Sequence, residues 1–305
     1  MKKIVKRLRK KFRDFLDSNS LVEMERQKLL MGKILSNQIK NKEFQARSLK
    51  DVEFSIFSQF GDDGIIQWLT QNLEIPNKTF IEFGVEDFSE SNCRFLMMND
   101  NWSGFVMDGS ELNIKNLKSS YYYWKYELAS KAVFINKDNI NDLIQEQEFN
   151  REVGLLHIDI DGNDYYIWDE INVIEPIIVI VEFNGIFGKD RSLSVIYDED
   201  FIRNNSHYSN LLFGSSIKSL YQLAEEKGYS FIGCNSGGNN AYFVRNDKLN
   251  DVVKSATLEQ GYVESKYRES RDKNGNLSFL NKTQARKLLK GVDVYNTSTK
   301  LVEKF

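Results

Sequence analysis

The stretch from Thr79 to Gly109 constrains the fold of this chain more than any other part of the sequence. It opens with a short apolar run that ends at Gly84, and a second apolar run over residues 104–108 ends at Asp108. A strand that ends at a glycine, then a helix, then a strand that ends at an acid is typical of a nucleotide-binding half-fold. Gly84 would allow a tight backbone turn beside a ligand, and Asp108 could accept hydrogen bonds from both ribose hydroxyls. The pattern predicts a bound adenosine-type cofactor.

The rest of the core repeats this alternation of strands and helices. Strands are predicted at 79–84, 104–108, 132–135, 154–160 and 177–183, and helices at 65–73, 89–99, 111–120, 139–147 and 164–171. This alternation favours a parallel sheet covered by helices on both faces. After a helix at 214–227, strands are predicted at 229–234 and 240–245, and their connection at residues 235–240 is too short for a parallel crossover. We therefore expect an α/β fold with a Rossmann-like seven-stranded sheet, mostly parallel, whose last strand is antiparallel.

Length and composition suggest one large α/β domain with appendages. The 305 residues divide into a basic helical N-terminal extension (1–50), the Rossmann-like domain (51–250) and a charged C-terminal extension (251–305). The net charge of −3 gives no bias toward nucleic acid. Two distant cysteines, Cys93 and Cys234, suggest reduced thiols. With no long uncharged apolar run and no signal-peptide core, we expect a cytoplasmic protein.

The first 13 residues form a strongly basic segment. They carry eight Lys or Arg and no acid, and Ile4, Val5, Leu8 and Phe12 would share one helical face. Such a helix could rest on the anionic inner face of a membrane. The other interpretations are the solvated start of a helix or an arm that docks on a partner protein.

Acidic side chains follow the fourth and fifth predicted strands. Asp159 and Asp161 end the fourth, and Glu182 and Asn184 end the fifth. Ligands of parallel sheets bind at the carboxyl ends of the strands, and these four residues would form an all-oxygen site for Mg²⁺ or another hard cation. The alternative is a hydrogen-bonded polar cluster that orients a substrate without a metal.

Candidates for a general base lie near the same edge. His207 lies in a polar and aromatic loop after the fifth strand and has a suitable unperturbed pKa, unless it is an ordinary surface histidine. Asp161 is the rival base. His157, within the fourth strand, is expected to be a hydrogen-bonded core residue. Residues 266–271 could fold back over the site, or could form a solvated charged helix.

Residues 55–245 resemble the class I S-adenosylmethionine-dependent methyltransferases, and within them the FkbM-like and bacterial sugar O-methyltransferase groups. Residues 58–63 look like the loop before the first strand in FkbM-like proteins, and residues 80–84 look like methyltransferase motif I. The usual motif has two further glycines, which are replaced here by Glu86 and Phe88. The resemblance also implies that an acid or amide after the third strand reaches the adenine amino group. Asp138 is the candidate, although it could simply cap a helix.

The resemblance implies O-methylation of a sugar hydroxyl in a capsule or lipopolysaccharide precursor. Glu82, Gly84, Asp108 and Asp138 would bind S-adenosylmethionine; Asp161, Glu182 and Asn184 would position the acceptor oxygen, directly or through a metal such as Mg²⁺; and His207 or Asp161 would take the proton. Two alternatives stay open. The Asp159-x-Asp161 pair also resembles the metal-binding pair of nucleotide-sugar glycosyltransferases, and the fold could be a non-catalytic binding module.

Overall fold

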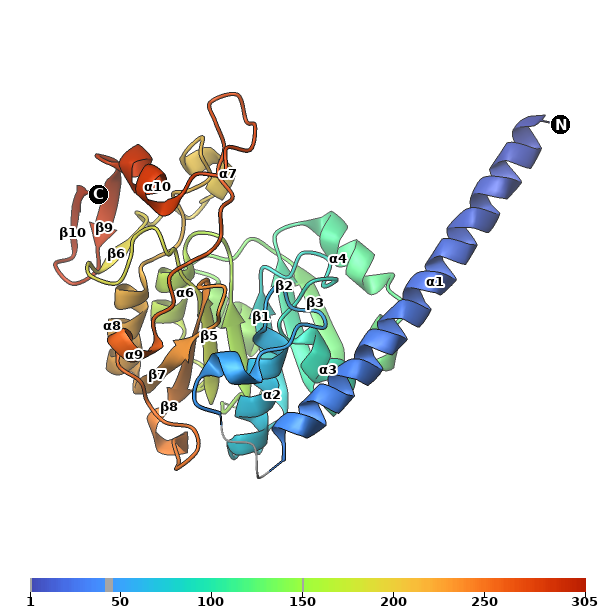
Figure 1. The fold of residues 1–305 in the computed structure, drawn as a ribbon, viewed down its shortest axis with the longest axis horizontal. Coiled ribbons are helices and arrows are strands. Elements are labelled where there is room, and N and C mark those ends of the chain that lie inside the picture. Colours follow the sequence, from blue (N-terminus) through green and yellow to red (C-terminus); the bar gives the residue numbers. More distant parts are fainter. Residues whose placement is uncertain (1, 42–45, 150) are drawn as a thin grey trace.

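The computed structural model describes residues 2–41, 46–149 and 151–305, and in the first helix it describes side chains at residue 20 and from residue 22 on. In this part of the chain, seven strands form one sheet in the order β3-β2-β1-β4-β5-β8-β7 (Figure 1). Their bounds are β1 Thr79–Phe83, β2 Ser103–Asp108, β3 Leu128–Ala132, β4 Leu155–Ile158, β5 Ile178–Glu182, β7 Tyr229–Cys234 and β8 Asn240–Arg245. The first five strands are parallel, and β8 is antiparallel to both of its neighbours. The predicted fold class is confirmed.

Helices cover both faces of this sheet. The helices are α1 Lys2–Ile39, α2 Asp62–Asn72, α3 Arg94–Asp100, α4 Glu111–Lys118, α5 Ile140–Gln145, α6 Asp164–Glu170, α7 Arg203–Ser206, α8 Ile217–Lys227, α9 Leu258–Gly261 and α10 Lys282–Leu289, with 3-10 turns η1 Leu49–Val52, η2 Tyr123–Lys125 and η3 Asn246–Lys248. One core cluster joins α2, α3 and α4 to the sheet, and another joins α5, α6 and α8 to its opposite face. Because both faces are buried, the central strands are mostly apolar and not alternating, with Glu82, His157 and Glu182 as their charged or titratable members.

The third strand lies earlier in the sequence than predicted. It was expected at residues 132–135, but β3 covers Leu128–Ala132. β3 is an edge strand of mixed polarity, so it carries no apolar run that would reveal it. The apolar run Val133–Ile135 follows the strand and lines a cavity instead.

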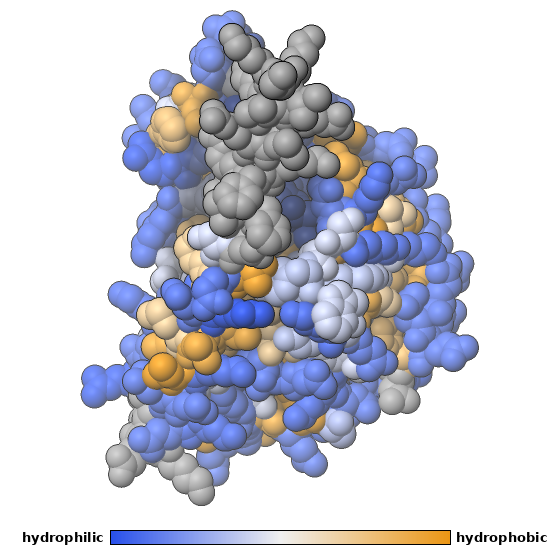
Figure 2. All heavy atoms as spheres, turned by 90° about the vertical axis from the view of Figure 1, so that its right-hand side faces the viewer, coloured by the Kyte–Doolittle hydropathy of each residue, from blue (hydrophilic) through white to orange (hydrophobic). Residues whose placement is uncertain are grey.

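The N-terminal region forms one long helix, α1, which contacts the domain through its C-terminal half and extends away from it at its N-terminus (Figure 1). An apolar helical face was predicted for residues 1–13, but the side chains of these residues lie outside the described part of the chain. Seen end-on from this side, the molecule presents mostly hydrophilic side chains with small apolar groups among them (Figure 2). No helix that the structure describes has both the length and the apolarity needed to cross a lipid bilayer.

A second, smaller sheet was not predicted. Its strands, in the order β10-β9-β6, are β6 Leu193–Ser194, β9 Asp293–Asn296 and β10 Leu301–Lys304. An apolar cluster packs this sheet against α10 and the loop at 211–212. β9 and β10 form a short local hairpin, but β6 joins it across about a hundred residues of sequence, so local patterns do not reveal this sheet. The small sheet anchors the C-terminal region, of which Ser265, Tyr267 and Glu269 line the cavity that residues 133–135 also line.

Candidate functional site

A cavity of about 580 Å³ opens at the carboxyl ends of the parallel strands. It lies where ligands bind in open α/β sheets, and its volume is in the range of small-molecule sites. Of the residues predicted from sequence, those in its wall are Glu82, Gly84, Asp108, Asp159, Asp161, Glu182 and Asn184. The structure thus brings together seven predicted residues from four strands. His207 and Asp138 are not part of the wall.

Gly84 makes the tight turn after β1 that the sequence predicted. Its φ is +70°, and an added Cβ would lie 1.6 Å from the carbonyl oxygen of Asp159. Its N–H donates to the carbonyl of Met107 at 2.9 Å. The position therefore requires glycine both for its backbone conformation and for the close approach of β4.

The two positions that differ from motif I by lacking glycine have backbone conformations that favour glycine. Glu86 and Phe88 occupy these positions, and both adopt left-handed backbone conformations, with φ of 47° and 63°. Such conformations cost a non-glycine residue roughly 1–2 kcal/mol each. The Glu86 N–H donates to Asp108 Oδ2 at 2.8 Å, which helps to hold the strained turn. The backbone therefore keeps a conformation suited to glycine where the sequence has lost it.

Asp108 lies at the end of β2, beside this turn. Its Oδ1 accepts hydrogen bonds from Ser110 N at 2.8 Å and Asn113 Nδ2 at 3.2 Å. A carboxylate offers about four acceptor positions, and with the Glu86 N–H on Oδ2 three of them are used, so about one is left for a ligand hydroxyl. Val133, Phe134 and Ile135 form the adjacent wall. A carboxylate beside an apolar wall fits a ribose joined to an aromatic base.

The prediction for Asp138 has to be corrected. Its side chain is exposed and lies outside the cavity wall. The Asp138 N–H donates to Asn136 Oδ1 at 3.1 Å, in the turn that leads into α5. The polar residues 136–139 thus form hydrogen bonds within this turn, whereas the apolar residues 133–135 before them line the cavity.

Glu82 is buried and holds the loop that follows β1. It accepts hydrogen bonds from Ser91 Oγ at 2.6 Å and Asn92 N at 2.9 Å, and His157 Nδ1 lies 3.0 Å from its Oε1. Burial alone would raise the pKa of Glu82, but His157 lowers it below its usual value. Burial would likewise lower the pKa of His157, but Glu82 raises it. As predicted, His157 is buried and partnered, and this ion pair lies in the cavity wall.

Three carboxylates converge after β4 and β5. Ligand atoms of Asp159, Asp161 and Glu182 all lie within 4.8 Å of one another. Burial and then repulsion by Asp161 raise the pKa of Asp159, and burial and then repulsion by Asp159 raise that of Glu182. The buried Asp164 shapes this loop, because its carboxylate accepts the N–H groups of residues 160 and 162 at 2.8 and 2.9 Å.

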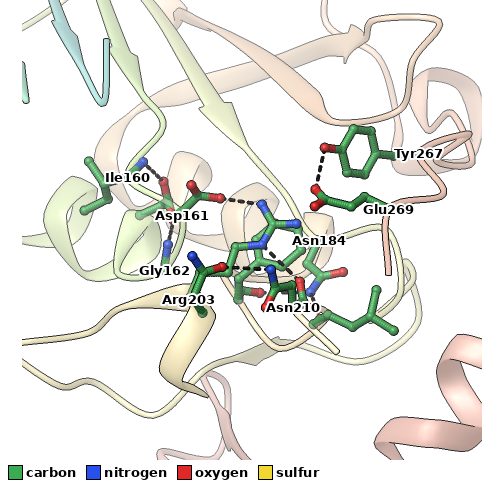
Figure 3. A network of polar contacts seen from close by, with 12 residues as sticks. Ile160, Asp161, Gly162, Asn184, Arg203, Asn210, Tyr267 and Glu269 are labelled. Carbon is green, nitrogen blue, oxygen red and sulfur yellow. Dashed lines mark hydrogen bonds and ion pairs between the residues drawn. The ribbon is translucent and has the colours of Figure 1, made fainter. Parts of the chain in front are cut away.

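Arg203, at the start of α7, supplies a cation to this cluster. Its Nη1 donates to Asp161 Oδ1 at 2.5 Å (Figure 3). The guanidinium stacks on the Phe213 ring at 3.8 Å, and Nε donates to the carbonyl of Asn210 at 3.0 Å. Sequence reasoning missed Arg203, because an arginine in a polar loop carries no local signal of a buried partner.

The four-residue metal site predicted from sequence does not form as expected. Asn184 is buried, and its Nδ2 donates to the carbonyls of Leu211 and Phe213, both at 2.9 Å. Its Oδ1 accepts the Ile186 N–H at 3.0 Å. Asn184 therefore fixes the loop that carries Phe213, and Asp161 is already paired with Arg203. The donor set does not fit the predicted Asp–Asp–Glu–Asn cage.

His207 is not positioned as a base. Its Nδ1 lies 2.6 Å from Ser209 Oγ, and its ring packs against Tyr208 with 4.4 Å between ring centroids. Burial lowers its pKa. Because the imidazole lies outside the cavity wall, its predicted catalytic role is not supported by its position.

Part of the C-terminal segment does fold back over the site, as one of the two interpretations of residues 266–271 expected. Ser265, Tyr267 and Glu269 line the cavity, and the segment is not helical. The Tyr267 hydroxyl donates to Glu269 Oε2 at 2.9 Å (Figure 3), and Arg271 Nη2 donates to Glu269 Oε1 at 3.0 Å. Burial raises the pKa of Tyr267 to about 12. These residues form the wall opposite the Asp161–Arg203 pair.

The loop at residues 58–63 joins the cavity to the hairpin between β7 and β8. Asp63 Oδ2 accepts the N–H groups of residues 56, 57 and 58 at 2.6, 2.8 and 2.9 Å. Asp62 accepts hydrogen bonds from Asn235, Asn240 and Tyr242. Gln59 lies in the cavity wall. The acidic pair is therefore structural, and it brings the hairpin to the edge of the site.

Comparisons with known proteins give distant structural likenesses only. No protein family and no curated protein matches the sequence. Solved structures that match include an O-methyltransferase from Bacillus cereus in complex with SAH (13% identity, 72% of this chain and 91% of that chain, TM-score 0.41). Others are the N-terminal domain of EvdMO1 with SAH bound (8%, 70% and 94%, TM-score 0.40) and an S-adenosylmethionine-dependent methyltransferase from Clostridium acetobutylicum (10%, 60% and 90%, TM-score 0.36). Because these likenesses are distant, the assignment of fold rests on the strand order of this chain.

Proposed function

We propose that this protein is an S-adenosylmethionine-dependent O-methyltransferase. The observation that carries the proposal is the combination, in one cavity, of the turn at Gly84, the carboxylate of Asp108 and the carboxylate cluster after β4 and β5. The first two suit an adenosine moiety, and the third lies where the adjacent strands end. A glycosyltransferase or a binding module would not need all three together.

The roles of the cofactor-binding residues follow from their positions. Asp108 would accept a ribose hydroxyl, and Val133, Phe134 and Ile135 would contact the adenine. Glu82 acts indirectly, by holding residues 91–93 and His157 in place. When bound, the cofactor supplies a methyl group on a sulfonium, which is a good electrophile. The remaining task of the protein is to align an acceptor hydroxyl and to remove its proton.

Asp159 is the best-placed proton acceptor. Methylation of the acceptor hydroxyl would release its proton, and a carboxylate of this wall would accept that proton. A base works best when its pKa approaches the working pH, and burial raises the pKa of Asp159 in that direction. Asp161, one of the two bases predicted from sequence, is held in its ion pair with Arg203 and would orient the acceptor.

Arg203 would take the place that a divalent cation has in metal-dependent relatives. Its guanidinium already pairs with Asp161, and Asn184 is committed to backbone groups. We therefore expect methyl transfer without an added metal. The sequence-based prediction of Mg²⁺ remains the rival account, with the three carboxylates as its ligands.

We further propose that the acceptor is a sugar or glycan precursor, as the resemblance implies. Phe201, Phe213 and Tyr267 line the acceptor side together with polar groups. Aromatic rings stack against the C–H faces of sugars, and polar groups bind their hydroxyls. The basic segment at residues 1–13 would bring the enzyme to an anionic membrane surface where such precursors are assembled.

The proposal is tested by incubating the purified full-length chain with S-adenosylmethionine labelled in the methyl group. Glycan precursor fractions serve as acceptors, with and without EDTA. We expect label in a base-stable ether on a sugar, at the same rate in both samples. Absence of transfer to every fraction would contradict the proposed activity. Loss of transfer in EDTA, restored by Mg²⁺, would contradict only the metal-independent account.

A further inference from the structure

The cavity wall carries an excess of negative charge. Among the lining residues that the structure describes, the acids are Glu82, Glu86, Glu90, Asp108, Asp159, Asp161, Glu182 and Glu269. The basic groups in the same wall are Arg203 and His157, which pair with Asp161 and Glu82. Phosphate or carboxylate groups on an acceptor would be repelled here. The wall suits a neutral or positively charged molecule.

Three buried acceptor atoms in this wall have no hydrogen-bond partner within the described part of the chain. They are Asn163 Oδ1, Glu182 Oε2 and Asn240 Oδ1. A buried acceptor left without a donor costs about 1–3 kcal/mol, and such atoms in a cavity wall point to a ligand that brings donors. Asn163 and Asn240 are each only 3% exposed, so bulk solvent scarcely reaches them.

The orientation of both amides is fixed by their other ends. Asn240 Nδ2 donates to Asp62 Oδ1 at 3.0 Å, and Asn163 Nδ2 donates to the carbonyl of Asp198 at 2.7 Å. Rotating either amide by 180° would place its own carbonyl oxygen against the acceptor oxygen of Asp62 or Asp198. The unpartnered atoms are therefore carbonyl acceptors.

Two of these acceptors are neighbours. Glu182 at the end of β5 is paired with Asn240 at the start of β8, in an antiparallel ladder. Residues directly opposite in such a ladder lie on one face, with Cβ atoms about 4.5–5.5 Å apart. A carboxylate oxygen and an amide oxygen therefore flank one point of the cavity. Nearby, Arg203 Nη2 is a buried donor without a partner among the residues described.

We propose that the acceptor carries a protonated amine, which binds between Glu182 and Asn240. An ammonium has three donors and no acceptor, so it matches two adjacent unpartnered acceptors and the negative wall. A hydroxyl on the same molecule would accept from Arg203. The substrate class is thus an amine-bearing polyol such as an amino sugar with a free amino group. This inference rests on the proposed function, and methylation stays on oxygen because an ammonium has no lone pair.

The test uses the full-length protein saturated with S-adenosylhomocysteine. Ligand-observed NMR compares glucosamine, galactosamine and mannosamine with their N-acetyl forms and with glucuronic and galacturonic acids. We expect each amine to bind at least about tenfold more tightly than its N-acetyl form, which corresponds to about 1.4 kcal/mol. Equal or tighter binding of the N-acetyl forms or the acids, or no binding of the amines, would overturn the inference. Failure of S-adenosylhomocysteine to bind would instead overturn the proposed function.

A matched pair of variants locates the amine. Glu182→Gln should abolish the preference for amines and leave the affinity for S-adenosylhomocysteine unchanged. Glu199→Gln, at an exposed glutamate outside the wall, should change neither. If Glu182→Gln does not fold, a pH series on the wild type tests the inference instead. The affinity for the amines should fall as the amine loses its proton at alkaline pH, whereas the affinity for the N-acetyl forms should not change. A second experiment measures the binding of Mg²⁺ alone by calorimetry. If the wild type binds Mg²⁺ tightly and Glu182→Gln does not, the inference would be overturned.

Discussion

At the scale of single residues, side chains in the cavity wall divide into those that face a ligand and those that hold the wall together. Sequence reasoning placed Gly84, Asp108, Asp159 and Glu182 in one site, because acids and glycines at strand ends are local signals. It could not see that Asn184 is committed to backbone carbonyls, because that depends on a loop almost thirty residues away.

Asp159→Asn should lower kcat by about 10²–10⁴-fold, the usual range for loss of a general base. The affinity for S-adenosylhomocysteine should change little, since Asp159 acts on the acceptor. Steady-state kinetics and calorimetry measure the two quantities. Asp169→Asn, on the exposed face of α6, is the control and should behave like the wild type. An unchanged kcat in Asp159→Asn would assign the proton to another group.

Asp63 should make stability depend on pH. Burial raises the pKa of Asp63 to about 6 from 3.8, although three backbone N–H groups oppose the shift. Between these values the folded state holds a proton that the unfolded state has lost, so the contribution of Asp63 to stability falls as pH rises. Two pKa units correspond to about 3 kcal/mol.

Urea unfolding of the wild type and of Asp63→Asn, near pH 4 and near pH 7, measures this effect. The wild type should lose up to about 3 kcal/mol relative to the variant over this range. The comparison removes the contributions of other titrating groups, which the two proteins share. Parallel stability profiles would show that the backbone donors keep Asp63 ionised.

At the scale of elements, α1 is fastened to the domain by a buried ion pair. Arg94 of α3 is 2% exposed and lies between the rings of Phe57 and Tyr122, at 4.1 and 4.2 Å. Its Nη2 donates to Glu25 Oε2 of α1 at 2.8 Å, and the Tyr121 hydroxyl donates to the same oxygen at 2.7 Å. A helix that is charged over much of its length is thus positioned by specific polar contacts, which also include the bond from Ser36 Oγ of α1 to Gln67 Oε1 of α2.

Glu25→Ala should lower the free energy of unfolding by about 1–3 kcal/mol. Removing the partner of a fully buried charge costs about 3–5 kcal/mol, and the partial exposure of Glu25 reduces that cost. Denaturant unfolding gives the value. Glu23→Ala is the matched control two residues away, because its pair with Arg26 is exposed and should be worth less than about 1 kcal/mol. Equal effects of the two substitutions would contradict the account.

The elements that sequence reasoning misplaced share a physical cause. β3 is an edge strand without an apolar run, β6 pairs with β9 across about a hundred residues of sequence, and β9 and β10 are short strands without a continuous apolar run. Central strands are buried on both faces and therefore carry continuous apolar runs, which is why they were found. Pattern thus predicts the interior of a parallel sheet better than its edges.

At the scale of the whole molecule, the fold class followed from the rhythm of strands and helices, and the antiparallel hairpin followed from a short connection. The shape of the acceptor side could not be predicted from the sequence. It depends on Arg203 of α7 and on Tyr267 and Glu269, which converge only through tertiary packing. The cofactor side is built from local strand-end turns, so it was the more predictable half of the site.

The central claim is that this cavity binds an adenosyl cofactor through Asp108. Calorimetry with S-adenosylhomocysteine tests it on the wild type, on Asp108→Ala and on Asp138→Ala, whose exposed carboxylate lies outside the wall. We predict one site per chain, an affinity at least about tenfold weaker in Asp108→Ala from the loss of charge-assisted hydrogen bonds, and no change in Asp138→Ala. Absence of binding by the wild type, or equal affinities in all three proteins, would contradict the claim.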